Sequence, residues 1–243
     1  MYQQFDRYEF KYPMPDRVAV GIKTLVLCYG MQPDPNAAHL PESSYTVSSL
    51  YFDSLVFGDY YEKAGGFLSR KKIRVRIYEP RLTMNTKEIW LEKKAKHDMR
   101  IAKNRILLPF EGYQTLLAGS HTAFLQQYGI NPSNQKIIHS IVREQMKPHV
   151  IVRYRRAPLL GQGPADFRVT FDSAIETCFS EDLCYAPAMK NMCAGVTVME
   201  VKFSTILPSW FKDILRRYNL ERAAFSKYAN AIEILSNYNP LPR

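Results

Sequence analysis

A run of basic residues between Arg70 and Arg105 is the part of the sequence best suited to chemistry. It holds 13 Lys or Arg and four acidic residues, and so carries most of the formal net charge of +10. Arginine forms bidentate hydrogen bonds with phosphoryl oxygens, and lysine supplies a compact charge. Many such side chains converging from several strands would bind a polyanion, and a triphosphate or a longer phosphate chain suits them best.

Charged and apolar residues alternate through this run with a period of two. The alternating charged residues are Lys72, Arg74 and Arg76, then Glu92, Lys94 and Lys96, and finally Lys103 and Arg105. Successive side chains of a β-strand point to opposite faces of its sheet, so the alternation predicts three strands with one ionic and one apolar face. Because positive charge dominates all three ionic faces, we interpret them as an anion-binding site rather than a solvated surface.

Acidic residues on the predicted ionic faces require a separate explanation. Three strand faces each combine a glutamate with a lysine, in the pairs Glu9 and Lys11, Glu92 and Lys94, and Glu200 and Lys202. For Glu9 and Glu92, balancing the charge of the neighbouring lysine explains the presence of a carboxylate as well as binding of a metal does. Glu200 is the candidate ligand of a divalent cation, because its apolar neighbours make the strand a costly place for an unpaired carboxylate.

The elements that must position these residues follow from the remaining periodicity. Strand-like alternation recurs at residues 8–12, 46–53, 149–156, 167–172 and 196–203. Helices are expected at residues 16–27, 110–117, 123–128, 132–146, 209–218 and 226–235. Eight antiparallel strands suit a small closed barrel. We therefore expect a single α+β domain over residues 1–243, with a closed β-barrel that forms a phosphate-binding tunnel and is flanked by helices.

Several function classes are excluded by what the sequence lacks. There is no phosphate-binding glycine loop, no dinucleotide glycine motif and no histidine-rich metal motif. The four cysteines show no C-x-x-C spacing, which argues against a zinc site or a disulfide framework and favours a cytoplasmic location. No apolar run approaches the ~20 residues of a membrane span, and the charged N-terminus does not resemble a secretory signal. Few aromatic residues lie among the basic ones, which argues against nucleic acid as a partner.

Nine stretches of the chain together resemble the VTC domain, the catalytic domain of the eukaryotic vacuolar transporter chaperone complex and of its bacterial relatives. That domain belongs to the triphosphate tunnel metalloenzyme, or CYTH-like, superfamily. The stretches are RYEFKY (7–12), SLYFDS (49–54), RKKIRVRIYE (70–79), IWLEKKAK (89–96), KNR (103–105), VRYRRAPL (152–159), FRVTFD (167–172), VMEVKF (198–203) and FSKYANAIEIL (225–235). They follow the family's order, and the chain is most similar to the bacterial stand-alone type.

The resemblance implies a tunnel, an activity, a metal and a set of functional residues. The terminal phosphoryl group of ATP would pass to a phosphate or polyphosphate acceptor inside the basic tunnel, with Mn²⁺ or Mg²⁺ as cofactor. Glu200 matches the metal-binding glutamate. The expected catalytic residues are Lys11, Arg74, Arg76, Lys94, Lys103, Arg156, Arg168 and Lys227. The residues expected to bind substrate are Arg105, Tyr154, Lys202, Ser226 and Glu92.

Two other activities stay open for the same fold. One is hydrolysis of tripolyphosphate or nucleoside triphosphates, which is disfavoured because the superfamily's hydrolases begin with an E-x-E-x-K strand and Arg7 stands here at the outer acidic position. The other is non-catalytic binding of polyphosphate.

The chain also departs from part of the family in two ways. Some members carry a lysine two residues before Ser226, where Ala224 stands here, so the phosphate register at that end is not defined by the resemblance. The inositol-phosphate-sensing domain and the membrane helices that accompany the eukaryotic complex are not seen in this sequence, so export of a product and that regulation would come from an undefined membrane partner or be absent.

Overall fold

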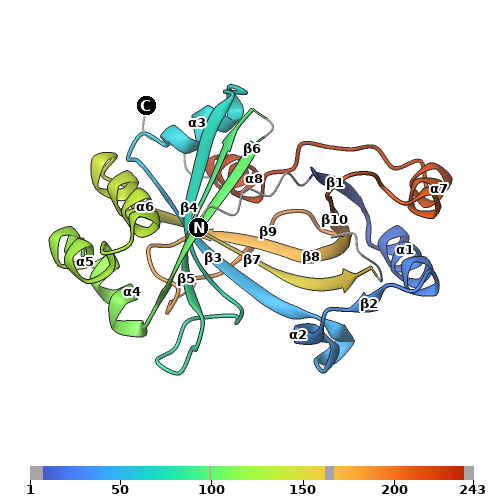
Figure 1. The fold of residues 1–243 in the computed structure, drawn as a ribbon, viewed down its shortest axis with the longest axis horizontal. Coiled ribbons are helices and arrows are strands. Elements are labelled where there is room, and N and C mark those ends of the chain that lie inside the picture. Colours follow the sequence, from blue (N-terminus) through green and yellow to red (C-terminus); the bar gives the residue numbers. More distant parts are fainter. Residues whose placement is uncertain (1–7, 99, 162–166, 186, 238–243) are drawn as a thin grey trace.

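The computed structural model describes residues 8–98, 100–161, 167–185 and 187–237 of the chain. Arg7 and most of the expected loop at 160–165 therefore lie outside the described residues. Within them, ten strands form one antiparallel sheet (Figure 1). They are β1 (Tyr8–Pro15), β2 (Gln32–Pro33), β3 (Tyr45–Asp53), β4 (Ser69–Ile77), β5 (Ile89–His97), β6 (Arg100–Leu108), β7 (Lys147–Leu160), β8 (Arg168–Phe179), β9 (Lys190–Asn191) and β10 (Val196–Phe203).

Helices flank this sheet, and all six predicted ones are present with ends that differ by at most a few residues. The α-helices in the described part of the chain are α1 (Asp16–Cys28), α2 (Pro35–Ala38), α3 (Gly58–Ala64), α4 (Phe110–Leu117), α5 (His121–Tyr128), α6 (Pro132–Arg143), α7 (Ser209–Arg217) and α8 (Lys227–Ser236). The sequence did not predict the short helix α2. Nor did it predict α3. It starts after Phe57, whose φ of 56° is left-handed and whose side chain forms no cap, so no sequence signal marks its start.

One face of the sheet is apolar and is covered by helices at both ends (Figure 1). At one end, α4, α5 and α6 bury Ile73 and Leu91 beneath residues such as Ile137. At the other end, α1 and α7 pack on β1, β8 and β10, where Val201 lies beside Phe211 in the core. A one-residue slip of any strand would expose this apolar set, so its burial directs the alternate, charged side chains to the opposite face.

The sheet is strongly curled around its ionic face. In a flat sheet, the six strand spacings between β1 and β5 would separate them by about 29 Å. Instead, the Nζ atom of Lys94 on β5 lies 2.8 Å from a carboxylate oxygen of Glu9 on β1. Side chains from strands far apart in the sheet order therefore meet on the ionic face.

The predicted closed barrel is wrong, because the sheet stays open between β1 and β6. The strand order runs β1-β10-β8-β7-β3-β4-β5-β6, and no pairing joins the two ends in the part of the chain that is described. The short strands β2 and β9 pair with β7 and β8 outside this path. The sheet therefore has ten strands instead of about eight, and it keeps two edges.

The outer edge of β1 explains why the sheet does not close. The backbone N–H of Ala223 donates to the carbonyl of Lys11 at 2.9 Å, so the segment before α8 already occupies this edge. Pro13 and Pro15 lie further along β1 and have no N–H to offer to another strand. Prolines within a strand are typical of an edge strand, so the sequence did contain a signal against closure.

Asp59 of α3 offers a test of stability on the apolar side of β4. Its side chain is 2% exposed and pairs with Lys71 at 2.8 Å. Burial, only partly offset by Lys71, raises the pKa of Asp59 to about 7. The folded pKa then exceeds the unfolded one, so stability falls as the pH rises between these two values. Through this group the wild type should lose about 2–3 kcal/mol of unfolding free energy between pH 5 and pH 8. The variant Asp59→Asn should not show this loss.

Urea unfolding at these two pH values measures this effect. Asp213→Asn on α7 is the matched control, since the Asp213 side chain is 68% exposed and its pH profile should follow that of the wild type. An Asp59→Asn profile as steep as the wild-type one would contradict the raised pKa.

Candidate functional site

The face opposite the apolar one gathers polar and ionic side chains from all eight longer strands. We call this surface the basic face. It comprises Glu9, Lys11, Tyr51, Lys72, Arg74, Arg76, Glu92, Lys94, Lys103, Arg105, Tyr154, Arg156, Arg168, Asp172, Glu200 and Lys202, joined by Ser226 and Lys227 at the start of α8. Basic residues outnumber acidic ones on it. The register thus brings every sequence-predicted site residue to one side of the sheet.

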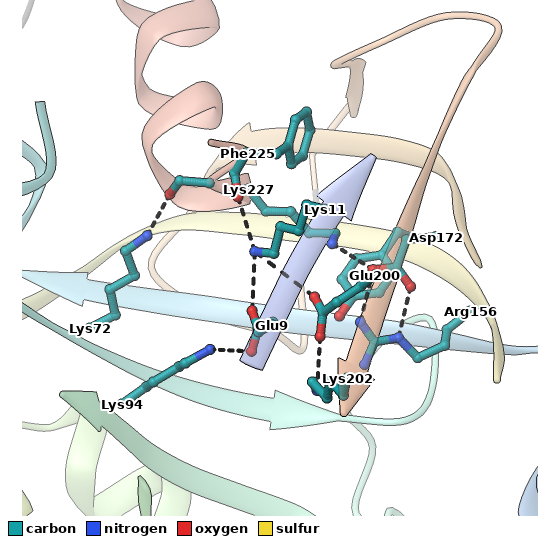
Figure 2. Close-up of polar contacts among 12 residues, drawn as sticks. Glu9, Lys11, Lys72, Lys94, Arg156, Asp172, Glu200, Lys202, Phe225 and Lys227 are labelled. Carbon is teal, nitrogen blue, oxygen red and sulfur yellow. Dashed lines mark hydrogen bonds and ion pairs between the residues drawn. The ribbon is translucent and has the colours of Figure 1, made fainter. Parts of the chain in front are cut away.

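Asp172 holds two of the expected catalytic cations in place (Figure 2). Its carboxylate is 0% exposed and accepts hydrogen bonds from Arg156 Nε at 2.7 Å, Arg156 Nη2 at 2.8 Å and Lys227 Nζ at 2.6 Å. Burial would raise the pKa of Asp172, but Arg156 and Lys227 lower it below its ordinary value. The carboxylate is therefore ionised and orients both cations.

Glu92 anchors a second group of cations on β4, β5 and β6. Arg74 donates to Glu92 Oε2 from Nε at 2.9 Å and from Nη2 at 2.7 Å, and Lys103 Nζ lies 2.5 Å from Oε1. Burial works against ionisation of Glu92, but the neighbouring cations hold its pKa far below the usual range. The side chain of Glu92 is only 1% exposed, whereas those of Arg74 and Lys103 are 18% and 44% exposed, so the two cations are more accessible from solution than the carboxylate that binds them.

Two tyrosines contact the arginines of β4 and so connect the Glu92 group with the Asp172 group. Arg74 Nη1 donates to the hydroxyl of Tyr51 at 3.1 Å, and Arg76 Nη2 donates to the hydroxyl of Tyr154 at 3.3 Å. Lys227 lies over the ring of Tyr154, with its Nζ 4.5 Å from the ring centroid. The arginine pair on β4 is thereby connected to the Asp172 group, although β4 and β8 are not neighbours in the sheet.

The carboxylates of Glu9 and Glu200 lie near each other on the adjacent strands β1 and β10 (Figure 2). Lys11 Nζ lies 3.4 Å from Glu9 and 3.9 Å from Glu200, while Lys94 and Lys202 each pair with one of them at 2.8 Å. Burial would raise both pKa values, yet the nearby lysines lower the pKa of Glu9 to about 2 and that of Glu200 well below its ordinary value. Both carboxylates are therefore ionised.

The donor atoms beside Glu200 fit Mg²⁺ or Mn²⁺. Both ions prefer oxygen ligands, and Mg²⁺ is commonly held by one or two carboxylates together with substrate phosphates. Thr170 lies opposite Glu200 in register, and its buried hydroxyl has no hydrogen-bond partner among the described residues. Those residues include no cluster of three His, Cys, Asp or Glu suited to a metal, so phosphate oxygens would have to complete the coordination.

Two predicted residues lie at the rim of the basic face. Arg105 is exposed, and its guanidinium group lies 4.3 Å from the ring centroid of Trp90. The side chain of Arg168 is 47% exposed and forms an ion pair with Asp34 at 3.4 Å. These two cations therefore stay accessible from solution, whereas Arg156 and Lys227 lie deeper.

Sequence reasoning missed two residues of the basic face, Asp172 and Tyr51, and gave Lys72 no role of its own. The alternation had placed Lys72 with Arg74, but no motif singled it out, and its contact with Ser226 depends on how α8 packs (Figure 2). Asp172 was on a predicted strand, but only the β7–β8 register reveals that it meets Arg156. No single-strand pattern contains that information.

Two surface hollows are lined by none of the basic-face residues. One, of about 570 Å³, is lined by Glu79, Pro80, Arg81, Thr83, Arg153, Cys184 and Tyr185. The other, of about 480 Å³, lies over α5 and α6 and includes Lys93 and His139. Neither combines several cations with a nearby carboxylate pair, so the basic face is the stronger candidate site.

The chain is similar to several known proteins. The family model described as the VTC domain matches residues 6–236. The PH1819 protein from Pyrococcus horikoshii has a similar structure, with a TM-score of 0.50 and 13% identity over 96% of this chain and 99% of that chain. A putative adenylate cyclase from Bacillus halodurans matches with a TM-score of 0.49 and 13% identity, over 95% of this chain and 98% of that chain. No curated protein matches the sequence.

The solved structure of the PH1819 protein shares the fold of this chain, an antiparallel sheet flanked by helices. The chain belongs to the VTC domain family, since the family model covers nearly all of it. The resemblance seen in the motifs is thereby confirmed, and membership implies polyphosphate or nucleotide-related ligands and a divalent metal. None of the helices in the described part of the chain combines the length and apolar character that a membrane crossing requires.

Proposed function

We propose that the protein is a metal-dependent polyphosphate polymerase that transfers the terminal phosphoryl group of ATP to a phosphate or polyphosphate acceptor on the basic face. The observation that carries this proposal is the convergence of arginines and lysines from many strands and α8, with buried Asp172 and Glu92 holding them in place. Membership of the VTC domain family supports the same substrate class.

The guanidinium groups of Arg74, Arg76 and Arg156 would bind the phosphates of the nucleotide. Guanidinium groups suit this task because their planar donors match pairs of phosphoryl oxygens. Their hydrogen bonds to Glu92, Ser49 and Asp172 are part of the fold, so the donors are oriented before substrate arrives. Positioning and charge stabilisation of this kind supply most of the catalysis in phosphoryl transfer.

The proposed reaction requires no covalent intermediate with the protein. An oxygen of the acceptor phosphate forms a bond to the γ-phosphorus of ATP, and the bond from that phosphorus to the β,γ-bridging oxygen breaks. ADP leaves with the electron pair of the broken bond, and the phosphate chain grows by one unit. Lys11, Lys94 and Lys227 would neutralise the charge on the group in transfer.

Glu200, with Glu9 beside it, would hold the divalent cation. When bound, the cation neutralises phosphoryl oxygens and so reduces the repulsion between two anionic substrates. The lysines at 2.8 and 3.9 Å keep Glu200 ionised, which is the form that metal binding requires.

Incubation of the purified protein with ATP and Mn²⁺ tests the proposal. Electrophoresis should reveal phosphate chains that lengthen with time, and one ADP should form for each phosphate incorporated. EDTA should stop both. Release of free phosphate from ATP or tripolyphosphate without chain growth would instead select a hydrolase, and tight binding with no turnover would select a non-catalytic polyphosphate binder.

A further inference from the structure

Lys72 is a cation of the basic face to which the family resemblance assigns no role. It lies on β4, two residues before Arg74, and its half-buried side chain points toward the start of α8 (Figure 2). There its Nζ atom donates a hydrogen bond to Ser226 Oγ, which also caps α8 by accepting from the N–H of Ala229. The ring of Tyr228 lies 5.8 Å from the same Nζ atom.

The surroundings of Lys72 differ from those of the other deep cations. Arg74, Arg156 and Lys227 each bind a buried carboxylate. Among the described residues, no acidic side chain pairs with Lys72, and Ser226 offers it only a neutral hydroxyl. The neighbouring charges that act on it most strongly are basic, namely Lys11 on β1, Lys94 on β5, Lys63 on α3 and Arg74 on β4.

The ammonium form of Lys72 lacks a counter-charge in this position, which favours the neutral amine until an anion binds. Burial and the four surrounding cations lower the pKa of Lys72 well below its ordinary value. Serine and tyrosine residues of α8 cannot supply the missing negative charge. An anion arriving beside Lys72 would do so, and it would raise the pKa of the ammonium group.

We propose that Lys72 is a phosphate-binding residue, which with Ser226 forms a subsite for one phosphoryl group at the α8 end of the basic face and takes up a proton when a phosphate chain binds. This assignment rests on the proposed binding of phosphate chains to the basic face. It adds Lys72 to the residues that bind the chain, and it adds the uptake of a proton to the binding step. Binding of the chain is then coupled to pH through Lys72.

Calorimetric titration with inorganic tripolyphosphate, in EDTA and in buffers of different ionisation enthalpy, measures both affinity and protons taken up. We expect Lys72→Met to weaken binding about tenfold, through loss of a charge-assisted hydrogen bond, and to reduce proton uptake. Lys72→Arg keeps a charge that does not titrate, so it should retain most of the affinity and lose the same part of the proton uptake.

Lys212→Met removes one charge from the exposed side of α7 and serves as the control, with affinity and proton uptake as in the wild type. Unchanged affinity or unchanged proton uptake in Lys72→Met overturns the assignment. If Lys72→Met does not fold, wild-type proton uptake in Lys72→Arg overturns it equally. Absence of tripolyphosphate binding by the wild type would contradict the proposed function itself, and so is distinguishable from a failure of the Lys72 assignment.

Discussion

Replacing Glu200 with Gln is expected to reduce polyphosphate synthesis by at least about 100-fold while leaving the binding of tripolyphosphate intact. Glutamine keeps the size of the side chain but removes the charge with which Glu200 would hold the metal. Without metal, loss of a negative charge beside Lys11 and Lys202 should even strengthen binding of the anion. Chain synthesis from ATP and Mn²⁺ and calorimetric binding in EDTA measure the two effects.

The matched control for this substitution is Glu111→Gln, which makes the same chemical change at an exposed site on α4, over the apolar face. It should leave synthesis unchanged. Synthesis retained in Glu200→Gln would remove Glu200 from the role of metal ligand. Loss of tripolyphosphate binding together with synthesis would assign it a role in substrate binding instead.

Replacing Asp172 with Asn is expected to lower the unfolding free energy by about 3 kcal/mol at pH 7. The buried carboxylate is the shared partner of Arg156 and Lys227, so its loss leaves two cations facing each other without a counter-charge. Tripolyphosphate should stabilise this variant more than it stabilises the wild type, because the anion replaces the missing charge. Urea unfolding with and without tripolyphosphate measures both effects.

The pH dependence of this substitution follows from the lowered pKa of Asp172. A carboxyl group whose folded pKa lies below its unfolded pKa stabilises the fold above the unfolded value, and this stability is lost as the pH falls through the folded one. The difference between the wild type and Asp172→Asn should therefore shrink as the pH falls below about 4. A difference that stays constant down to pH 3, or an equal loss in the exposed control Asp213→Asn, would contradict this role.

The ionic strands of the candidate site were predictable from the sequence because their pattern is local. Alternation of Lys72, Arg74 and Arg76 with aliphatic residues determines which side chains share a face, and β4 confirms it. The strand predicted at 196–203 coincides with β10 for the same reason. Strand β7 is longer than predicted because it continues through Pro158 and Leu160, where no alternation of polar residues marks a strand. Strand β8 is longer because its pairing with β7 continues to Phe179, opposite Val150.

The features that escaped prediction depend on contacts between distant segments. The sheet stays open because Ala223 occupies the edge of β1 through a hydrogen bond to the carbonyl of Lys11. In the sequence, only the prolines of β1 indicated that this strand lies at an edge. The anchoring role of Asp172 depends on the β7–β8 register, which a bulge near Arg153 shifts. Such a shift is not encoded in any short pattern of either strand.

The most direct test of the basic face as the binding site is a crystal structure of the protein with tripolyphosphate and Mn²⁺. We expect the phosphate chain to lie on the basic face, with its oxygens in hydrogen-bond contact with Arg74, Arg156 and Lys227 and the metal at Glu200. A chain bound instead in the hollow beside Arg81 and Arg153, with the basic face left without phosphate, would contradict this account.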